Sequence, residues 1–227
     1  MNILIVNGSA DLYGASRILG LVIEELSKDN KVYLLLPENG PMVDWLKDKK
    51  INVHVIFPGN VPVIARRFNT ASGLASLFVD YIKSYFFIKK LAVEYKIDIA
   101  YANGAACLFM VKIFNKLKIR SVLHFHEILE TPRKLVTVLN KWALSWPDHV
   151  VCVSNAVKEN LMACNTGSVN QDKVTVIYNG IEDIRKTVPK TTDKIIITLI
   201  GRITEAKGIW FFLDSVEKLE PLTAKLC

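Results

Sequence analysis

The sequence predicts an α/β protein, with a Rossmann-like, doubly wound parallel sheet followed by an incomplete second Rossmann-like domain. Short β-branched and apolar runs alternate with segments whose apolar residues recur at helical spacing, which is typical of βα units. The strand-like runs are apolar at nearly every position, as expected for strands that helices cover on both faces. A last run of this kind begins at Ile195 after a polar stretch, and few residues follow it.

The first domain is expected to span residues 1–181. Strands are predicted at 2–6, 32–36, 51–57, 98–102, 121–125, 149–153 and 174–177. Helices are predicted after the loop at 9–13 and at 41–49, 70–95, 105–116, 134–144 and 155–162. Because a helical crossover joins most successive strands, the strands are expected to run parallel.

Residues 182–193, EDIRKTVPKTTD, are predicted to be an interdomain linker because they are polar, contain Pro189 and show no periodicity. Residues 194–227 are predicted to supply only the first strand and helix of a truncated second domain. A second domain of the usual size would need about 100 residues or more. The apolar strand would then lack a sheet to cover it, so we expect this part to be mobile, to pair with something else or to aggregate.

Composition and charge narrow the classes of partner and the expected location. The chain is 51% apolar and 22% charged, as in a soluble globular protein. Its net charge of +7 favours anionic partners such as nucleic acid, acidic lipids or phosphorylated small molecules. The four cysteines lack CxxC spacing, and no signal peptide or transmembrane stretch is found. The expected location is the cytoplasm, in solution or peripherally on the inner face of the membrane.

Candidate ligand-binding residues lie where predicted strands end, because open α/β sheets bind ligands at the carboxyl ends of their strands. Gly8 and Gly14 flank the first loop, where backbone N–H groups could approach a phosphate or a sugar; ordinary turn chemistry explains them equally well. His126 is expected at the mouth of its strand, with His124 on the same face. The alternative is a satisfied core histidine. No metal site is expected, because no spacing supplies a third ligand.

Further cleft residues are predicted at the other strand ends. They are Asn103, Glu127, Ser154, Asn179 and Gly180. Ser154 could equally cap the helix that follows it, and Asn179-Gly180 could be an ordinary turn. The chain has no GxSxG, P-loop or GxGxxG motif, which argues against hydrolase, NTPase and dinucleotide-binding functions.

The stretch 195–208, IIITLIGRITEAKG, places two cations between a strand and a helix entrance. Arg202 can form two parallel hydrogen bonds with phosphate oxygens. Lys207 adds a point charge where free helix N–H groups favour anions. The pattern predicts a phosphate site, and the alternative is a pair of solvated surface cations.

The long helix predicted at 70–95 carries a second surface feature. Between residues 62 and 96 there are six basic and two acidic residues. The predicted core stripe is Leu74, Leu77, Phe78, Tyr81, Tyr85, Ile88 and Ala92. An aromatic ring, Phe87, is expected among lysines on the solvated face, which predicts binding to an anionic membrane surface. The predicted membrane-facing residues are Arg66, Arg67, Lys83, Phe86, Phe87 and Lys90. The alternative is a helix covered by its neighbours. Nucleic acid is not expected, because no nucleic-acid-binding motif is present.

Five motifs, read in order, resemble those of the family-4 retaining glycosyltransferases of the GT-B fold. They are LYGASR, HFHE, VCVSNAVKENL, VIYNGIED and GRITEAKG. The resemblance runs from Met1 to about Leu219. It implies two Rossmann-like domains that face a cleft, the first mainly for the acceptor and the second for the nucleotide-sugar. It also implies a glycan or lipid-linked acceptor, often at the cytoplasmic membrane face, and no cofactor or metal besides the nucleotide-sugar co-substrate.

The resemblance also implies roles for single residues. Arg202 and Lys207 would hold the donor diphosphate and stabilise the leaving group. His126 would face the donor sugar near its reacting carbon, and Gly14 would lie by the phosphates or the acceptor. The family's glycine pair is Tyr13-Gly14 here, and its donor-binding glutamates have no counterpart.

We therefore expect the sequence to be that of a glycosyltransferase. We also expect the truncated chain by itself to have negligible transferase activity. One alternative is a non-catalytic acceptor- or membrane-binding module that a partner chain completes. A further alternative is a nucleotide-sugar epimerase of the GT-B type.

Overall fold

The computed structural model describes residues 1–64, 70–130, 132–163, 171–180, 196–201, 203–218 and 225–226. The chain forms two compact units, Met1–Ile181 and Glu182–Cys227. The division falls where the sequence predicts the first domain to end. The predicted linker at 182–193 lies outside the described residues.

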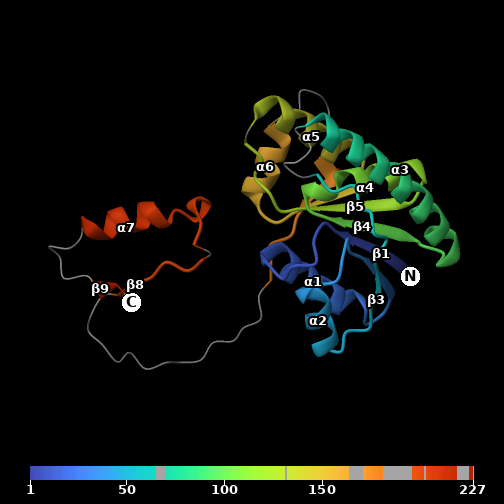
Figure 1. Ribbon diagram of the computed structural model, residues 1–227, viewed down its shortest axis with the longest axis horizontal. Coiled ribbons are helices and arrows are strands. Elements are labelled where there is room, and N and C mark those ends of the chain that lie inside the picture. Colours follow the sequence, from blue (N-terminus) through green and yellow to red (C-terminus); the bar gives the residue numbers. More distant parts are fainter. Residues whose placement is uncertain are drawn as a thin grey trace. The chain divides into compact units, whose positions relative to one another are not determined.

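The first unit is built on a seven-stranded parallel sheet with the order β3-β2-β1-β4-β5-β6-β7 (Figure 1). The predicted α/β class and the Rossmann-like sheet are therefore confirmed. The strands are β1 (Asn2–Asn7), β2 (Lys31–Leu35), β3 (His54–Ile56), β4 (Ile99–Asn103), β5 (Arg120–Phe125), β6 (His149–Cys152) and β7 (Val174–Val176). The edge strand β3 is shorter than predicted, because only three of its residues pair with β2.

Helices cover both faces of this sheet. They are α1 (Gly14–Leu26), α2 (Pro41–Asp48), α3 (Ala71–Glu94), α4 (Leu108–Lys116), α5 (Arg133–Ser145) and α6 (Asn155–Ala163), with the short 3₁₀ turns η2 (Ala105–Cys107) and η3 (Gln171–Lys173). In Figure 1, α1 and α2 lie below the sheet and α3 to α6 lie above it. Side chains of β1 alternate between the two cores: Ile5 packs with α1 and α2, whereas Leu4 packs with α3 to α6.

Helix α3 turns most of its predicted apolar stripe to the core, since Leu77 and Ile88 are buried and Tyr81 and Tyr85 pack against the core, but it departs from the prediction at three residues. Leu74 and Phe78 are exposed, whereas Phe87 is half-buried and packs against the core instead of lying among lysines. The buried face includes two polar residues, Asp80 and Ser84. The loop residue Asn60 satisfies both: its Nδ2 donates to Asp80 Oδ1 at 2.8 Å, and its carbonyl accepts from Ser84 Oγ at 2.8 Å.

The second unit contains the helix α7 (Ile209–Glu217), the 3₁₀ turn η4 (Glu205–Lys207) and the short strands β8 (Ile196–Ile197) and β9 (Lys225–Leu226), which pair in parallel. Strand β8 is shorter than the predicted run of apolar residues. Several large apolar side chains of this unit are exposed, and Ile200 is 90% accessible. In the described part of α7, Val216 is the one buried residue.

Candidate functional site

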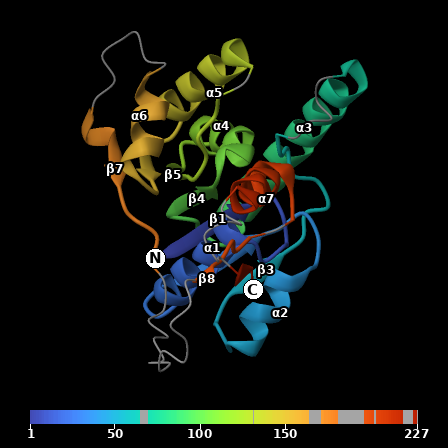
Figure 2. The same ribbon diagram turned by 90° about the vertical axis from the view of Figure 1, so that its left-hand side faces the viewer.

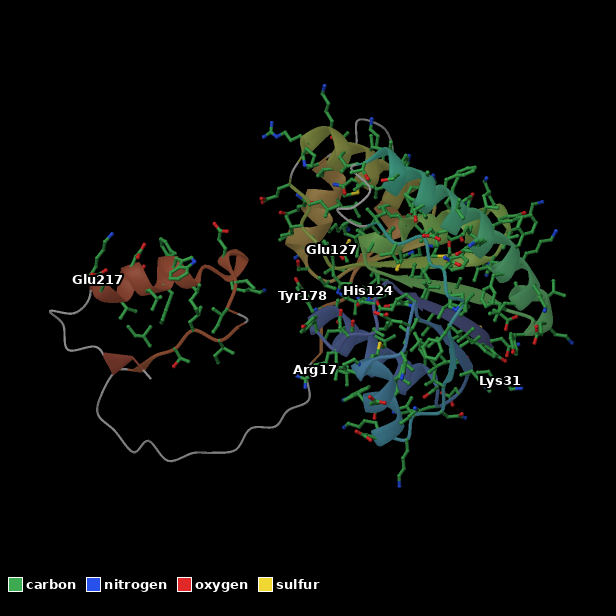
Figure 3. All side chains as sticks on the ribbon, in the orientation of Figure 1. Arg17, Lys31, His124, Glu127, Tyr178 and Glu217 are labelled. Carbon is green, nitrogen blue, oxygen red and sulfur yellow. The ribbon has the colours of Figure 1, made fainter. Side chains whose placement is uncertain are left out.

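The sheet order reverses between β1 and β4, so their carboxyl ends diverge into separate loops and leave a crevice. A pocket of about 280 Å³ lies there. Its lining residues are Asn7, Gly8, Ser9, Asp11, Tyr13, Ala15, Ser16, Val63, Asn103, Gly104, Ala106 and Glu127. Figure 3 shows His124 and Glu127 at this edge of the sheet, while Lys31, which begins β2, marks the opposite edge.

The loop after β1 is organised by one carboxylate. Asp11 accepts hydrogen bonds from Ser9 Oγ at 2.6 Å, from Ser16 Oγ at 3.1 Å and from the Tyr13 N–H at 3.0 Å. The last of these orders the residue before α1, whose first turn borders the pocket through Ala15. The sequence prediction missed Asp11; its only local signal is a carboxylate three residues before the start of a helix.

Three side chains form a directed row of hydrogen bonds that begins at the pocket with Asn7 and Asn103 and ends at His126, which is not one of the pocket's lining residues. Asn7 Nδ2 donates to the Ser9 carbonyl at 2.8 Å. Asn103 Nδ2 donates to Asn7 Oδ1 at 2.9 Å, and Asn103 Oδ1 pairs with His126 Nε2 at 2.9 Å. We name Ser9, Asn7, Asn103 and His126 the amide relay. The first bond determines its direction, because a main-chain carbonyl can only accept.

The amide relay defines the tautomer of His126. Since Asn7 Nδ2 faces a carbonyl, Asn7 Oδ1 must accept from Asn103 Nδ2, which leaves Asn103 Oδ1 to accept from His126. His126 Nε2 therefore carries a proton, and in the neutral ring Nδ1 keeps its lone pair. Burial lowers the pKa of His126, while the nearby Glu127 carboxylate acts in the opposite direction. The ring is therefore a neutral hydrogen-bond acceptor at Nδ1.

Glu127 ties the ends of β4 and β5 together. Its Oε2 accepts from the Ala105 N–H and from the His126 N–H, both at 3.1 Å. Gly104 makes room for this carboxylate, because a Cβ at that position would lie 2.8 Å from Glu127 Oε1. Its φ of +82° is also one that residues with a Cβ rarely adopt.

His124 lies behind His126 and is buried. The ring centroids are 4.1 Å apart, and the Tyr101 hydroxyl pairs with His124 Nδ1. Burial lowers the pKa of His124 to about 3, with a smaller contribution from His126. Burial raises the pKa of Tyr101, so its hydroxyl keeps its proton and pairs with a neutral imidazole. The structure thus places His126 at the strand's mouth, as predicted, and His124 in the interior.

The other predicted strand-end residues lie in different settings. Gly8 and Asn103 line the pocket with Glu127, whereas Gly14 is exposed as the first residue of α1. Ser154 caps α6, since its Oγ accepts from the Val157 N–H at 3.2 Å. Asn179 and Gly180 are exposed beyond β7.

The predicted phosphate site lies in the second unit. Lys207 ends η4, and Gly208, with a φ of +68°, leads into α7. Arg202 lies outside the described residues, as do Arg66 and Arg67 of the predicted membrane surface. Within the described part of the chain, no cluster of three or more His, Cys, Asp or Glu residues could hold a metal ion. No helix described by the structure is long and apolar enough to cross a membrane.

Comparison with known proteins decides the family. Residues 42–185 match the model of glycosyltransferase family 4. The chain belongs to glycosyltransferase family 4. This match confirms the family resemblance and contains three of the five motifs, HFHE, VCVSNAVKENL and VIYNGIED; it spans most of the first unit, including β4 to β7 and the His126 loop.

Two glycosyltransferase relatives match parts of the sequence. The GPI3 subunit of a phosphatidylinositol N-acetylglucosaminyltransferase from Saccharomyces cerevisiae is 28% identical over 136 residues, which cover 53% of this chain and 30% of the relative. An uncharacterized glycosyltransferase from Methanocaldococcus jannaschii is 33% identical over 92 residues, covering 34% of this chain and 23% of the relative. The matched regions are thus less than a third of either relative.

Solved structures share the fold. The Anabaena protein HepE, crystallised with UDP-glucose, superposes with a TM-score of 0.72 at 20% identity, over 100% of this chain and 59% of that one. A glycosyltransferase from Rickettsia africae superposes with a TM-score of 0.66 at 18% identity, over 96% and 57%. The chain therefore spans about three fifths of the length of these GT-B neighbours.

Proposed function

We propose that this chain carries the acceptor side of a retaining glycosyltransferase that takes a nucleotide-sugar donor and a glycan or lipid-linked acceptor. The observation that carries the proposal is the pocket between β1 and β4, whose lining residues Asn7 and Asn103 connect through the amide relay to a neutral His126. Family membership supplies the reaction class.

The neutral state of His126 suits glycosyl transfer. Positive charge develops at the anomeric carbon in an oxocarbenium-like transition state, and an imidazolium beside it would oppose that charge. A neutral ring can instead accept a hydrogen bond at Nδ1 from a sugar hydroxyl. The Tyr13 side chain does not cap α1, and the first turn of this helix borders the pocket through Ala15, where main-chain N–H groups can meet sugar or phosphate oxygens.

On the donor side, Arg202 and Lys207 are proposed to hold the diphosphate of the nucleotide-sugar without a metal ion. UDP-glucose is the first donor to test, because the Anabaena neighbour binds it. We expect no measurable transfer by the 227 residues on their own, because they match only 59% of that neighbour's length.

A chimera tests the proposal. Residues 1–181 would be joined to the second domain of the Anabaena protein, and UDP release from UDP-glucose would be measured with phosphatidylinositol vesicles as acceptor; release also reports transfer to water. We expect release in the chimera and a loss of about 100-fold in His126→Ala. His149→Ala is the matched control, since His149 bonds to Thr175 away from the pocket. UDP release that His126→Ala leaves unchanged would remove the pocket from the reaction.

A second candidate is a non-catalytic acceptor- or membrane-binding module that a partner chain completes; the yeast relative, which is named as a subunit of a transferase, supports the need for a partner. A chimera that folds but releases no UDP from UDP-glucose or UDP-N-acetylglucosamine favours this candidate. The epimerase alternative draws on the fold of a Neisseria meningitidis UDP-GlcNAc 2-epimerase, which superposes with a TM-score of 0.53 at 16% identity over 78% of this chain and 45% of that one. Conversion of UDP-N-acetylglucosamine into its C2 epimer would favour it.

A further inference from the structure

A second pocket, of about 360 Å³, opens on the outer surface of the helix layer formed by α3, α4 and α5. Figure 2 shows these helices side by side, with the first turns of α3 projecting beyond the others. Helix α4 supplies the floor through Phe109, Lys112 and Lys116, which share one face at helical spacing. Tyr81 of α3 and Trp142 of α5 stand on the two sides. We name this feature the aromatic groove.

The aromatic groove offers rings and hydrocarbon, with two ammonium groups at its border. Trp142 and Trp146 stack with centroids 4.7 Å apart, and Phe109 meets Trp142 at 5.9 Å. Lys112 Nζ lies 4.9 Å from the Trp146 ring centroid, and Lys116 Nζ lies 5.5 Å from that of Tyr81. A ligand with a hydrocarbon part and an anionic end matches both features.

Exposed apolar residues of α3 extend the aromatic groove along the surface. Leu74, Phe78, Ile82 and Phe86 follow one another at intervals of four residues, so they share one side of the helix. Phe78 is 66% accessible and Phe86 is 64% accessible. Because the opposite side of α3 already packs in the core, this helix has two apolar sides, and the outer side has no cover among the described residues.

Charge identifies what covers this surface. Helices α3, α4 and α5 carry eight basic and two acidic residues, and one of the acids, Asp80, is buried against Asn60. Two such surfaces would repel each other, which argues against a second copy of the chain. Aromatic rings and aliphatic side chains bordered by lysines match the interface of an anionic bilayer.

We propose that the outer face of α3, α4 and α5 docks on an anionic membrane, with a lipid acyl chain entering the aromatic groove and Lys112 and Lys116 contacting headgroup phosphates. Of the two aromatic residues predicted to face the membrane, Phe86 is exposed and belongs to this face, whereas Phe87 packs against the core. The proposal is independent of the transferase chemistry, because the aromatic groove and the pocket beside His126 share no lining residue.

Flotation of the whole chain with vesicles tests the docking. We expect binding to vesicles of equal parts phosphatidylglycerol and phosphatidylcholine, and little binding to phosphatidylcholine alone. Phe78→Glu should reduce partitioning by about tenfold or more, because it places a carboxylate on the docking face. The pair Lys112→Gln and Lys116→Gln should lower it by about fivefold for each lysine.

Matched controls lie near α2, on the other side of the sheet. Phe57→Glu and the pair Lys47→Gln and Lys49→Gln change similar side chains there and should bind as the parent chain does. Urea unfolding of each variant verifies the fold. The proposal is overturned if the groove variants bind like the parent chain, or if the parent binds neutral vesicles equally well. It is also overturned if the chain ignores vesicles and forms a dimer that Phe78→Glu breaks.

Tryptophan quenching tests whether an acyl chain enters the aromatic groove. In a Trp210→Phe background, Trp142 and Trp146 lie in the groove, while Trp45 packs near Gly20 on the other face. Vesicles with brominated acyl chains should quench the emission, and unbrominated vesicles should not. Flotation without quenching would rule out entry of a lipid acyl chain into the aromatic groove.

Discussion

At the scale of single residues, His126 is the member of the amide relay that titrates. The hydrogen bonds of Asn7, Asn103 and the Ser9 carbonyl determine which of its ring nitrogens carries the proton. Asn7 and Asn103 are register partners on β1 and β4, although they lie 96 residues apart in the chain. Their amides are buried and transmit the direction that the Ser9 carbonyl imposes. A change of one of these amides into a carboxylate should therefore change the pKa of the His126 imidazole.

Asn103→Asp tests this coupling. The new carboxylate can still accept from His126 Nε2, but its negative charge stabilises the imidazolium, so we expect the pKa of His126 to rise above that of the parent protein. A pH titration of the imidazole Cε1–H resonance in NMR measures it. Asn115→Asp, on the far side of the helix layer, is the control and should leave the resonance unchanged. An unchanged pKa in Asn103→Asp would contradict the relay.

His124 should make the protein sensitive to acid. Its pKa is lowered to about 3 in the folded protein, whereas the unfolded chain has a value of about 6.5, so the unfolded state binds the extra proton first. The stabilisation is fully present above pH 6.5 and is lost as the pH falls toward 3. At pH 4.5 the loss should be about 3 kcal/mol, and His124→Gln should not show it.

Urea unfolding at pH 7 and pH 4.5, for the parent protein and His124→Gln, isolates this contribution from the titration of all other groups. His149→Gln changes a partly exposed histidine and should keep the pH dependence of the parent. Equal pH dependence in the parent and in His124→Gln would show that this ring does not resist protonation.

Sequence patterns identify single site residues only in part. Alternation along the strand predicted that His124 and His126 share a face, and their rings lie 4.1 Å apart, but alternation alone did not decide which of them lies at the strand end. The roles of Asn7 and Asp11 could not be predicted, because each depends on partners that the register of β1 against β4 and the path of a loop bring together.

At the scale of elements, the turn after β4 combines an unusual backbone conformation with close packing. Gly104 has a φ of +82°, and its missing Cβ leaves room for the Glu127 carboxylate. Gly59 has a similar φ of +73° but no neighbour within 4 Å of the position of a Cβ. A comparison of substitutions at Gly104 and Gly59 therefore distinguishes the cost of backbone strain from the cost of a steric clash.

Gly104→Ala should destabilise the protein by about 2–3 kcal/mol, since it adds strain and a clash with Glu127. Gly59→Ala should cost about 1 kcal/mol, because it adds strain alone. Free energies of unfolding from urea titrations measure both. Equal costs for the two substitutions would mean that the contact with Glu127 adds nothing.

Strands and helices were predictable where one periodicity dominates, and less so where polar residues are buried. In α3 the core face contains Asp80 and Ser84, which a periodicity of apolar residues assigns to solvent. Only the loop at Asn60 makes their burial favourable, and its position is not visible in the sequence. The apolar pattern therefore gave the correct helix and most of its core face, but it missed the two buried polar residues and the packing of Phe87.

At the scale of the whole molecule, the two units differ in how well they bury their apolar residues. Strand β1 pairs on both sides and its central residues are inaccessible, whereas α7 buries one residue among those described. We expect amide hydrogens of β1 and β4 to exchange only through global unfolding. Those of α7 should exchange about 100-fold faster or more, through local opening.

Hydrogen exchange followed by mass spectrometry measures this contrast within one sample, because peptides of β1 and α7 are recovered together. Comparable protection of α7 and β1 would show that the second unit is as stable as the first. The alternation of strands and helices was sufficient to predict the parallel sheet. The strand order was not predictable, because it depends on pairings between distant segments.

The fixed direction of the amide relay has a consequence for which molecules the pocket accepts. Whatever group meets His126 Nδ1 must bring its own proton, since that nitrogen offers only a lone pair. A sugar hydroxyl qualifies, whereas the same position blocked as a methyl ether or oxidised to a ketone presents one lone pair to another. Under the proposed function, the main chain at Ser9 would thus favour, through two amides and a ring, a ligand with an unmodified hydroxyl group at His126.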